Sequence, residues 1–208
     1  MLNAEVLTFQ EFVTHEPLPL SRIQGAVLEF LQGRDDVVLF GAQAVNAYVA
    51  EPRATRVVDV MSTRGAELAE ELREFLSDRF HIAVRVREVA GAKGLRVYQV
   101  RKEGNRRLFD IREVSELPKS EKIDNVEVLS PLQLIVSKVV SYHSRRGNPK
   151  SGTDWRDIGE LVLRFPELKG SVSAELEKLE RSDELLGTWN TIAEFGFESP
   201  DEDDDLNY

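Results

Sequence analysis

The stretch Leu39-Phe40-Gly41-Ala42-Gln43-Ala44-Val45-Asn46 decides the fold of this chain of 208 residues. Residues 36–40 predict a short apolar strand, Gly41 and Ala42 interrupt it, and residues 43–49 predict a helix that Pro52 ends. Backbone N–H groups at the start of a helix are unpaired and favour anions, and a glycine lets a ligand approach them closely. The stretch therefore predicts a turn that can hold a phosphate. The alternative is an ordinary strand–helix turn without a ligand.

The pattern on both sides of this turn predicts an α+β fold, in which helices flank a mixed β-sheet and a helical part follows. Strands are expected over residues 56–61, 82–89, 95–102 and 107–114, and the last three form an antiparallel run. Helices are expected over residues 21–32, 65–80, 131–145, 153–165 and roughly 173–195. We expect a sheet domain over residues 1–125, a helical part over 126–197 and a disordered acidic tail over 198–208.

Two aspartates lie inside apolar strands. Asp59 lies between Val58 and Val60, and Asp110 lies within Leu108-Phe109-Asp110-Ile111. A carboxylate in such a strand costs free energy unless it is paired, hydrogen-bonded or bound to a metal. If the strands are neighbours, the two acids can share a divalent ion. The alternative is that each acid pairs with a nearby arginine, such as Arg53 or Arg107.

Composition limits the classes of function. The formal net charge is −10, so the chain as a whole does not resemble a general nucleic-acid binder. Basic residues nevertheless cluster around residues 101–107 and 145–150, where a local anion site or ordinary solvated charge would both fit. The chain has no cysteine, which excludes disulfides and zinc-thiolate sites. No apolar run is long enough to span a bilayer, and no signal peptide is evident, so we expect a cytoplasmic protein without a membrane partner.

The order of these motifs resembles the minimal nucleotidyltransferases of the AbiEii toxin type, within the DNA polymerase β-like superfamily. The first half matches the pattern Gly-x-x-Ala, then Arg-x-Thr-x-Asp-x-Asp, at Gly41, Ala44, Arg53, Thr55 and Asp59. The second half matches a helix that delivers a lysine, at residues 129–138, and an Arg, Lys-Asp-x-x-Asp region at Arg145 or Arg146, Lys150, Asp154 and Asp157. The resemblance covers roughly residues 20–165.

The resemblance implies a nucleotidyltransferase-like fold, a nucleoside triphosphate ligand and magnesium. Asp59 and Asp110 would be the catalytic and metal-binding acids. The nucleotide would be bound by residues from both halves of the chain: Gly41, Ala42, Arg53, Thr55, Lys138, Lys150 and Asp154. The acceptor would be RNA or protein, and the protein would be the toxin of a toxin–antitoxin pair with a cognate antitoxin as partner.

The chain departs from the family pattern at two positions. Val57 occupies the place of the first acid of the Asp-x-Asp pair, and a valine cannot bind magnesium. Ala42 lacks the hydroxyl with which the second turn residue would contact a phosphate. The rival hypothesis is therefore a catalytically inactive relative that acts as a binding or interaction module.

The residues of the second half also have structural alternatives. Lys138 would be an ordinary solvated lysine on the polar face of a helix. Asp154 and Asp157 would stabilise the first turn of a helix through its dipole.

Overall fold

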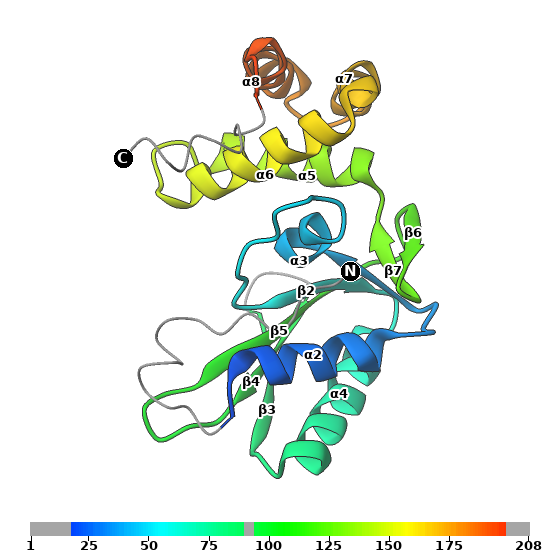
Figure 1. Cartoon of the computed structure of the whole chain (residues 1–208). Coiled ribbons are helices and arrows are strands. Elements are labelled where there is room, and N and C mark those ends of the chain that lie inside the picture. The colour runs from blue at the N-terminus through cyan, green and yellow to red at the C-terminus, as the bar shows by residue number, and fades with distance from the viewer. Residues whose placement is uncertain (1–17, 90–93, 199–208) are drawn as a thin grey trace. The chain divides into compact units, whose positions relative to one another are not determined.

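The computed structural model describes residues 18–89 and 94–198 (Figure 1). The chain divides into two compact units, Met1–Ser130 and Pro131–Tyr208. The domain boundary expected after residue 125 falls in the turn between two strands of the first unit. Apart from Glu198, the acidic tail predicted over residues 198–208 lies outside the described residues.

The first unit contains one mixed sheet of seven strands, in the order β3-β4-β5-β2-β1-β7-β6. Its elements are α2 (Leu20–Leu31), β1 (Val37–Phe40), α3 (Gly41–Asn46), β2 (Val58–Ser62), α4 (Gly65–Phe80), β3 (Val84–Glu88), β4 (Gly94–Gln99), β5 (Arg106–Glu113), β6 (Ser120–Ile123) and β7 (Val126–Leu129). β2 runs parallel to β5 and β1 parallel to β7, and the remaining neighbours are antiparallel. The predicted mixed sheet with flanking helices and the antiparallel run β3–β4–β5 are confirmed. The hairpin β6–β7 was not predicted from the sequence.

α4 lies against one face of the sheet and fixes which side chains of the strands form the core. Leu68, Leu72 and Leu76 recur at helical spacing and are fully buried. Val60 and Ile111 lie side by side on this face, and Gly65 at the start of α4 contacts Ile111. Because side chains alternate along a strand, the residues between these apolar positions lie on the opposite face.

The second unit is helical. Its elements are α5 (Pro131–Ser144), α6 (Lys150–Arg164), a 3-10 turn η1 (Pro166–Leu168), α7 (Lys169–Leu176) and α8 (Ser182–Glu194). The single helix expected over residues 173–195 is wrong, because Arg181 adopts a left-handed backbone conformation with φ 62° and separates α7 from α8. Trp189 and Ile192 of α8 are buried with Val172 of α7, so the two short helices share one core.

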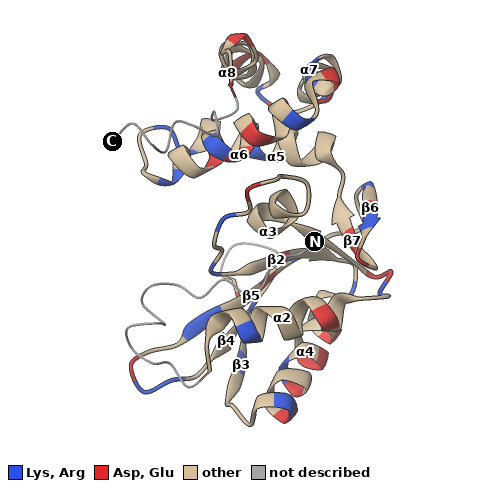
Figure 2. Cartoon of the chain, in the orientation of Figure 1, with Lys and Arg blue, Asp and Glu red and all other residues tan. Residues whose placement is uncertain are grey.

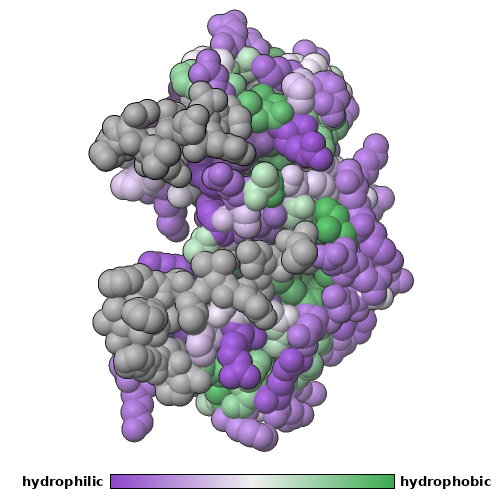
Figure 3. Space-filling view, in the orientation of Figure 1, coloured by the Kyte–Doolittle hydropathy of each residue, from purple (hydrophilic) through white to green (hydrophobic). Residues whose placement is uncertain are grey.

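Hydrophilic side chains cover most of the visible surface of each unit, and hydrophobic ones show only in small groups (Figure 3). Over the part of the chain that the structure describes, no helix combines the length and apolarity needed to cross a membrane.

Candidate functional site

The two strand aspartates lie directly beside each other. β2 and β5 are parallel neighbours, and their register pairs Asp59 with Asp110. Both residues are half-buried, whereas the adjacent Val58 and Val60, and likewise Phe109, are buried against the core. Laterally paired residues of a sheet project from the same face. The two carboxylates therefore lie on the face of the sheet opposite α4, as expected of acids that could share a ligand.

Gly41 lies against the first of these aspartates. Phe40 pairs with Asp59 across β1 and β2, and the chain turns at the next residue, Gly41, with φ +74°. A Cβ atom added at Gly41 would lie 2.8 Å from Oδ2 of Asp59. The position thus needs glycine for its backbone angle and for the approach of the carboxylate. Ala42 follows as the second residue of α3 and is half-buried.

Arg107 occupies both oxygens of Asp110. Its Nε donates to Oδ1 and its Nη2 pairs with Oδ2. Arg96 approaches the same carboxylate from β4, with its Nε 3.6 Å from Oδ2 of Asp110. Burial lowers the pKa of Arg107, and the neighbouring charge of Arg96 lowers it further, whereas Asp59 raises it. The pairing of an acid with a nearby arginine, which the sequence left open for Asp110, is therefore what the structure contains.

A bulge in β5 makes this pairing possible. Residues three apart in a regular strand lie on opposite faces, yet Arg107 and Asp110 meet on one face. The register with β4 shifts at this point: Val97 pairs with Phe109, and the next residue, Tyr98, pairs with Arg107. Leu108 is the extra residue, and it is buried together with Phe109. The bulge thus turns Arg107 towards Asp110.

The acids do not fit a centre for two magnesium ions. Within residues 18–89 and 94–198, no group of three or more acidic, histidine or cysteine side chains could hold a metal ion. Val57 directly precedes β2 and supplies no ligand. An ion at Asp59 and Asp110 would compete with Arg107 for Asp110, and magnesium replaces a missing anionic ligand poorly.

Arg53 and Thr55 lie on the loop between α3 and β2, which is fixed to α3 through buried amides. Oδ1 of Asn46 accepts from the backbone N–H of Arg53, and its Nδ2 donates to the backbone oxygen of Arg53. The hydroxyl of Thr55 donates to Oε1 of Gln43. Gln24 of α2 donates to the backbone oxygen of Thr55. Gln43 and Asn46 were not singled out in the sequence, although amides inside a mostly apolar helix were a signal that could have found them.

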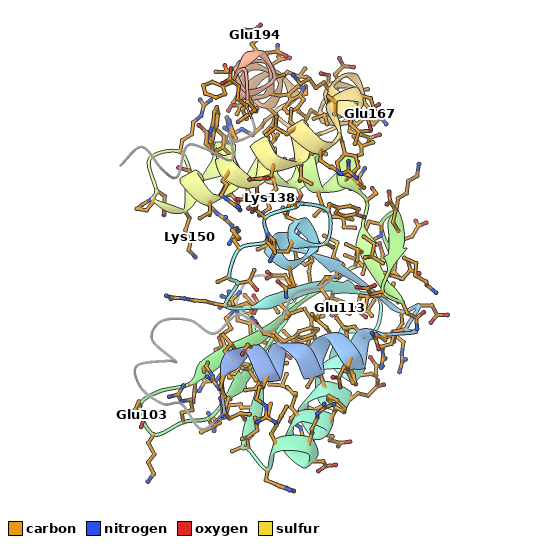
Figure 4. The ribbon with its side chains drawn as sticks, in the orientation of Figure 1. Glu103, Glu113, Lys138, Lys150, Glu167 and Glu194 are labelled. Carbon is orange, nitrogen blue, oxygen red and sulfur yellow. The ribbon has the colours of Figure 1, made fainter. Side chains whose placement is uncertain are left out.

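In the second unit, Lys138 lies on α5 (Figure 4), and its ammonium group faces two aspartates of α6. Its Nζ donates to Oδ2 of Asp157 at 2.5 Å and lies 3.5 Å from Oδ1 of Asp154. Arg145 pairs with the other oxygen of Asp154. Lys138 is buried, so the alternative of an ordinary solvated lysine is wrong. Lys150 is the first residue of α6 and is exposed.

Asp154 and Asp157 do not stabilise the first turn of their helix. We expected α6 to begin at Thr153, but it begins at Lys150, and its first turn contains no acid. Both aspartates are buried one turn further along and face Lys138 instead. The structural alternative based on the helix dipole is thus replaced by a buried ion-pair network.

Comparison with known proteins gives structural matches only. No protein-family model matches the chain, and neither does any curated protein. A polyadenylate synthase from Megavirus superposes on 76% of the chain with a TM-score of 0.59 and 11% identity, and the chain spans 34% of that enzyme. JHP933 from Helicobacter pylori superposes on 90% of the chain, with a TM-score of 0.50, 13% identity and 94% of its own length covered. A nucleotidyltransferase-like protein from Paracoccidioides brasiliensis covers 88% of the chain at 19% identity, with a TM-score of 0.44 and 94% of its own length covered.

At these identities the likeness concerns the fold. The chain has the nucleotidyltransferase-like fold that the sequence resemblance implied. The AbiEii type, the metal, the acceptor and the toxin role are finer statements, and they are matters of proposal.

Proposed function

We propose that this chain is a nucleotidyltransferase-superfamily protein that binds a nucleoside triphosphate beside Gly41, and that its magnesium-dependent nucleotide transfer is weak or absent. The observation that supports this proposal is the lateral pairing of Asp59 with Asp110 next to the glycine turn. In the family that the sequence resembles, two carboxylates in this position would serve a nucleotide site, which supports the proposal. The arginine on Asp110 and the valine at position 57 support the expectation of weak transfer, because each reduces the number of carboxylates open to magnesium.

The resemblance to AbiEii-type toxins extends the proposal. It adds Ala42, Arg53, Thr55, Lys138, Lys150 and Asp154 as nucleotide-binding residues. It also adds an RNA or protein acceptor and a place in a toxin–antitoxin pair. The buried state of Lys138 between two aspartates favours a supporting role for it, because a lysine that already neutralises two carboxylates has little charge left for a phosphate.

The test is calorimetry of the natural chain and of Val57→Asp with ATP and GTP at fixed magnesium. The substitution places an acid two residues before Asp59, where the family pattern has one, so we expect magnesium-dependent binding to strengthen by about tenfold, which corresponds to about 1.4 kcal/mol. Val57→Asn is the matched control, since asparagine has a size and polarity similar to those of aspartate but carries no charge. It should not change the affinity.

A second pair of variants assigns the gain to the site. In the Asp59→Asn background, Val57→Asp should bind no better than the natural chain, because the added acid only replaces the one that was removed. Rapid transfer by the unaltered chain would show that Asp59 and Asp110 suffice. Absence of triphosphate binding in every variant would instead support the interaction module, which the pairing of Arg107 with Asp110 already favours.

A further inference from the structure

The face of the sheet opposite α4 carries a group of arginines on the strands β3, β4 and β5. We name this group the arginine face; its members are Arg85, Arg87, Arg96, Arg107 and Arg112. On β3, the exposed Arg85 and Arg87 alternate with the half-buried Val84 and Val86. Arg87 pairs with Arg96 across β3 and β4. The side chains of these strands thus sort by alternation into an apolar face and a cationic face.

The register places the arginines in rows. One row runs from Asp110 of β5 through Arg96 of β4 to Arg87 of β3. The next row contains Arg107, Tyr98 and Arg85. Strands lie ~4.8 Å apart and alternate residues ~6.8 Å apart, so the arginine face measures about 10 Å by about 14 Å. A single triphosphate does not span such an area.

Charge is separated within the first unit. The arginine face carries five positive charges. Asp59 and Asp110, which pair with each other across β2 and β5, lie beside it. On the other side of the sheet, α4 carries five acids against two arginines, although the whole chain has a net charge of −10. Figure 2 shows basic residues along β4 and β5 and acidic residues along α4. Within the first unit, the arginine face and α4 therefore carry opposite charge on opposite sides of the sheet.

The arginines crowd one another. Burial lowers the pKa of Arg107 and the charge of Arg96 lowers it further, so the two guanidinium groups repel each other at this site. The buried Nε of Arg96 has no hydrogen-bond acceptor among the described residues, since Asp110 is 3.6 Å away. An anion bound beside Arg96 and Arg107 would offset this repulsion.

We propose that the arginine face binds the phosphate backbone of a nucleic-acid strand. All five cations are arginines, whose planar guanidinium groups bind phosphate oxygens with two hydrogen bonds. Tyr98 lies in the middle of the face, with the guanidinium carbon of Arg87 6.0 Å from the centre of its ring. Arginine beside an aromatic ring is a usual composition of surfaces that bind single strands. The inference rests on the RNA acceptor of the proposed function and gives that acceptor a surface beside the triphosphate site.

The experiment measures fluorescence anisotropy of a labelled single-stranded poly(U) RNA with the full chain over a series of potassium chloride concentrations. Arg107 is already paired with Asp110, so it is not counted among the phosphate contacts. Each neutralised phosphate of a single strand contributes about −0.7 to the slope of log K against log salt, so the other four arginines give a slope of about −2.8. Arg85→Gln with Arg87→Gln should lower the affinity by at least about tenfold and reduce the slope to about −1.4. Both residues are exposed, so the fold should tolerate the change.

The matched control removes two arginines from the opposite side of the sheet. Arg73→Gln with Arg79→Gln on α4 changes the net charge by the same amount, and both residues are ion-paired with glutamates. It should leave the slope unchanged. An equal loss of affinity in both double variants would show that net charge alone acts and would overturn the proposal.

Two further arms distinguish other ligands. A labelled acidic peptide that binds as well as the RNA, with the same dependence on Arg85 and Arg87, would replace nucleic acid by an acidic protein partner and refute the inference. A DNA duplex that binds more tightly than the single strand would also contradict it. ATP titration of the natural chain is scored separately, so RNA binding without ATP binding would overturn the proposed function alone.

Discussion

Gly41 and Asp59 show how closely the backbone approaches the candidate site. The turn at Gly41 places its α-carbon beside a carboxylate, at a backbone angle that side chains rarely adopt. Gly41 therefore has two separable roles: it adopts the backbone angle of the turn, and it leaves room for the carboxylate of Asp59. A second glycine of the same unit, Gly33, has nearly the same angle, φ +75°, and more room, since an added Cβ would lie 3.4 Å from Nδ2 of Asn125.

We predict that Gly41→Ala lowers stability more than Gly33→Ala and abolishes triphosphate binding. Both substitutions incur the left-handed penalty of about 1 kcal/mol. Only Gly41→Ala also pushes its Cβ onto Oδ2 of Asp59, whose carboxylate must then leave its position beside the turn. Urea unfolding and ATP calorimetry of both variants measure the two effects. Equal stability losses with retained ATP binding in both would refute the spatial role of Gly41.

At the scale of single residues, the sequence predicts the acids of the candidate site well and the arginines that pair with them poorly. Asp59 and Asp110 could be found because a carboxylate inside an apolar strand is costly, and this signal is local. Arg96 could not be found, because its approach to Asp110 depends on the register between β4 and β5. Arg107 was named only as one alternative, because the bulge that turns it towards Asp110 has no local signature.

Among the elements, α6 contains a glycine that allows an aromatic ring to pack closely against the helix. Gly159 lies in the middle of this helix, and an added Cβ would lie 2.8 Å from two ring carbons of Phe197. Phe197 also contacts Trp155, with ring centroids 5.4 Å apart. Gly187 of α8 is likewise helical, but an added Cβ would have no described atom within 4 Å. The two positions share a backbone conformation and differ only in their surroundings.

Gly187→Ala should stabilise the second unit by about 0.5–1 kcal/mol, because alanine is the better helix former. Gly159→Ala should instead leave stability unchanged or lower it, since its methyl group displaces the ring of Phe197. In a Phe197→Ala background the same Gly159→Ala change should become stabilising. Denaturant midpoints of the four variants and the natural chain test this. A gain for Gly159→Ala in the natural background would show that the ring moves aside without cost.

The elements differ in how well the sequence predicts them. α4 matches its expected range because three leucines repeat at helical spacing over its whole length. β6 and β7 were missed because they are four residues long and β6 has a single apolar residue, Ile123. The prediction joined α7 and α8 into one helix, because the left-handed backbone conformation of the arginine between them leaves no signal in the sequence. Short elements and unusual backbone angles thus depend on tertiary contacts, which periodicity does not reveal.

For the whole molecule, the important property is the contrast between local and net charge. The tail from Glu198 to Asp205 contains six acids, and without them the formal charge of −10 becomes −4. At long range, the net negative charge of the chain repels a polyanion. The arginine face attracts it only at short range.

Replacing these six tail acids by the corresponding amides should raise the association rate for RNA at low salt. At 0.15 M salt the Debye length is about 8 Å, so the difference from the natural chain should largely disappear there. The dissociation rate should stay constant, because the arginines that contact phosphate are unchanged. Stopped-flow measurements at two salt concentrations test this. A slower dissociation in the amide variant would mean that the tail itself competes for the RNA-binding surface.

The bulge at Leu108 has a consequence for comparing this chain with its relatives. Residues from Phe109 onward keep their pairing with β2, whereas Arg106 and Arg107 are shifted by one place against β4. An alignment with a relative whose β5 is regular must therefore open a gap of one position at Leu108. Without that gap, every residue of the preceding hairpin would be compared with a neighbour of its true counterpart, and an inward side chain would be matched with an outward one.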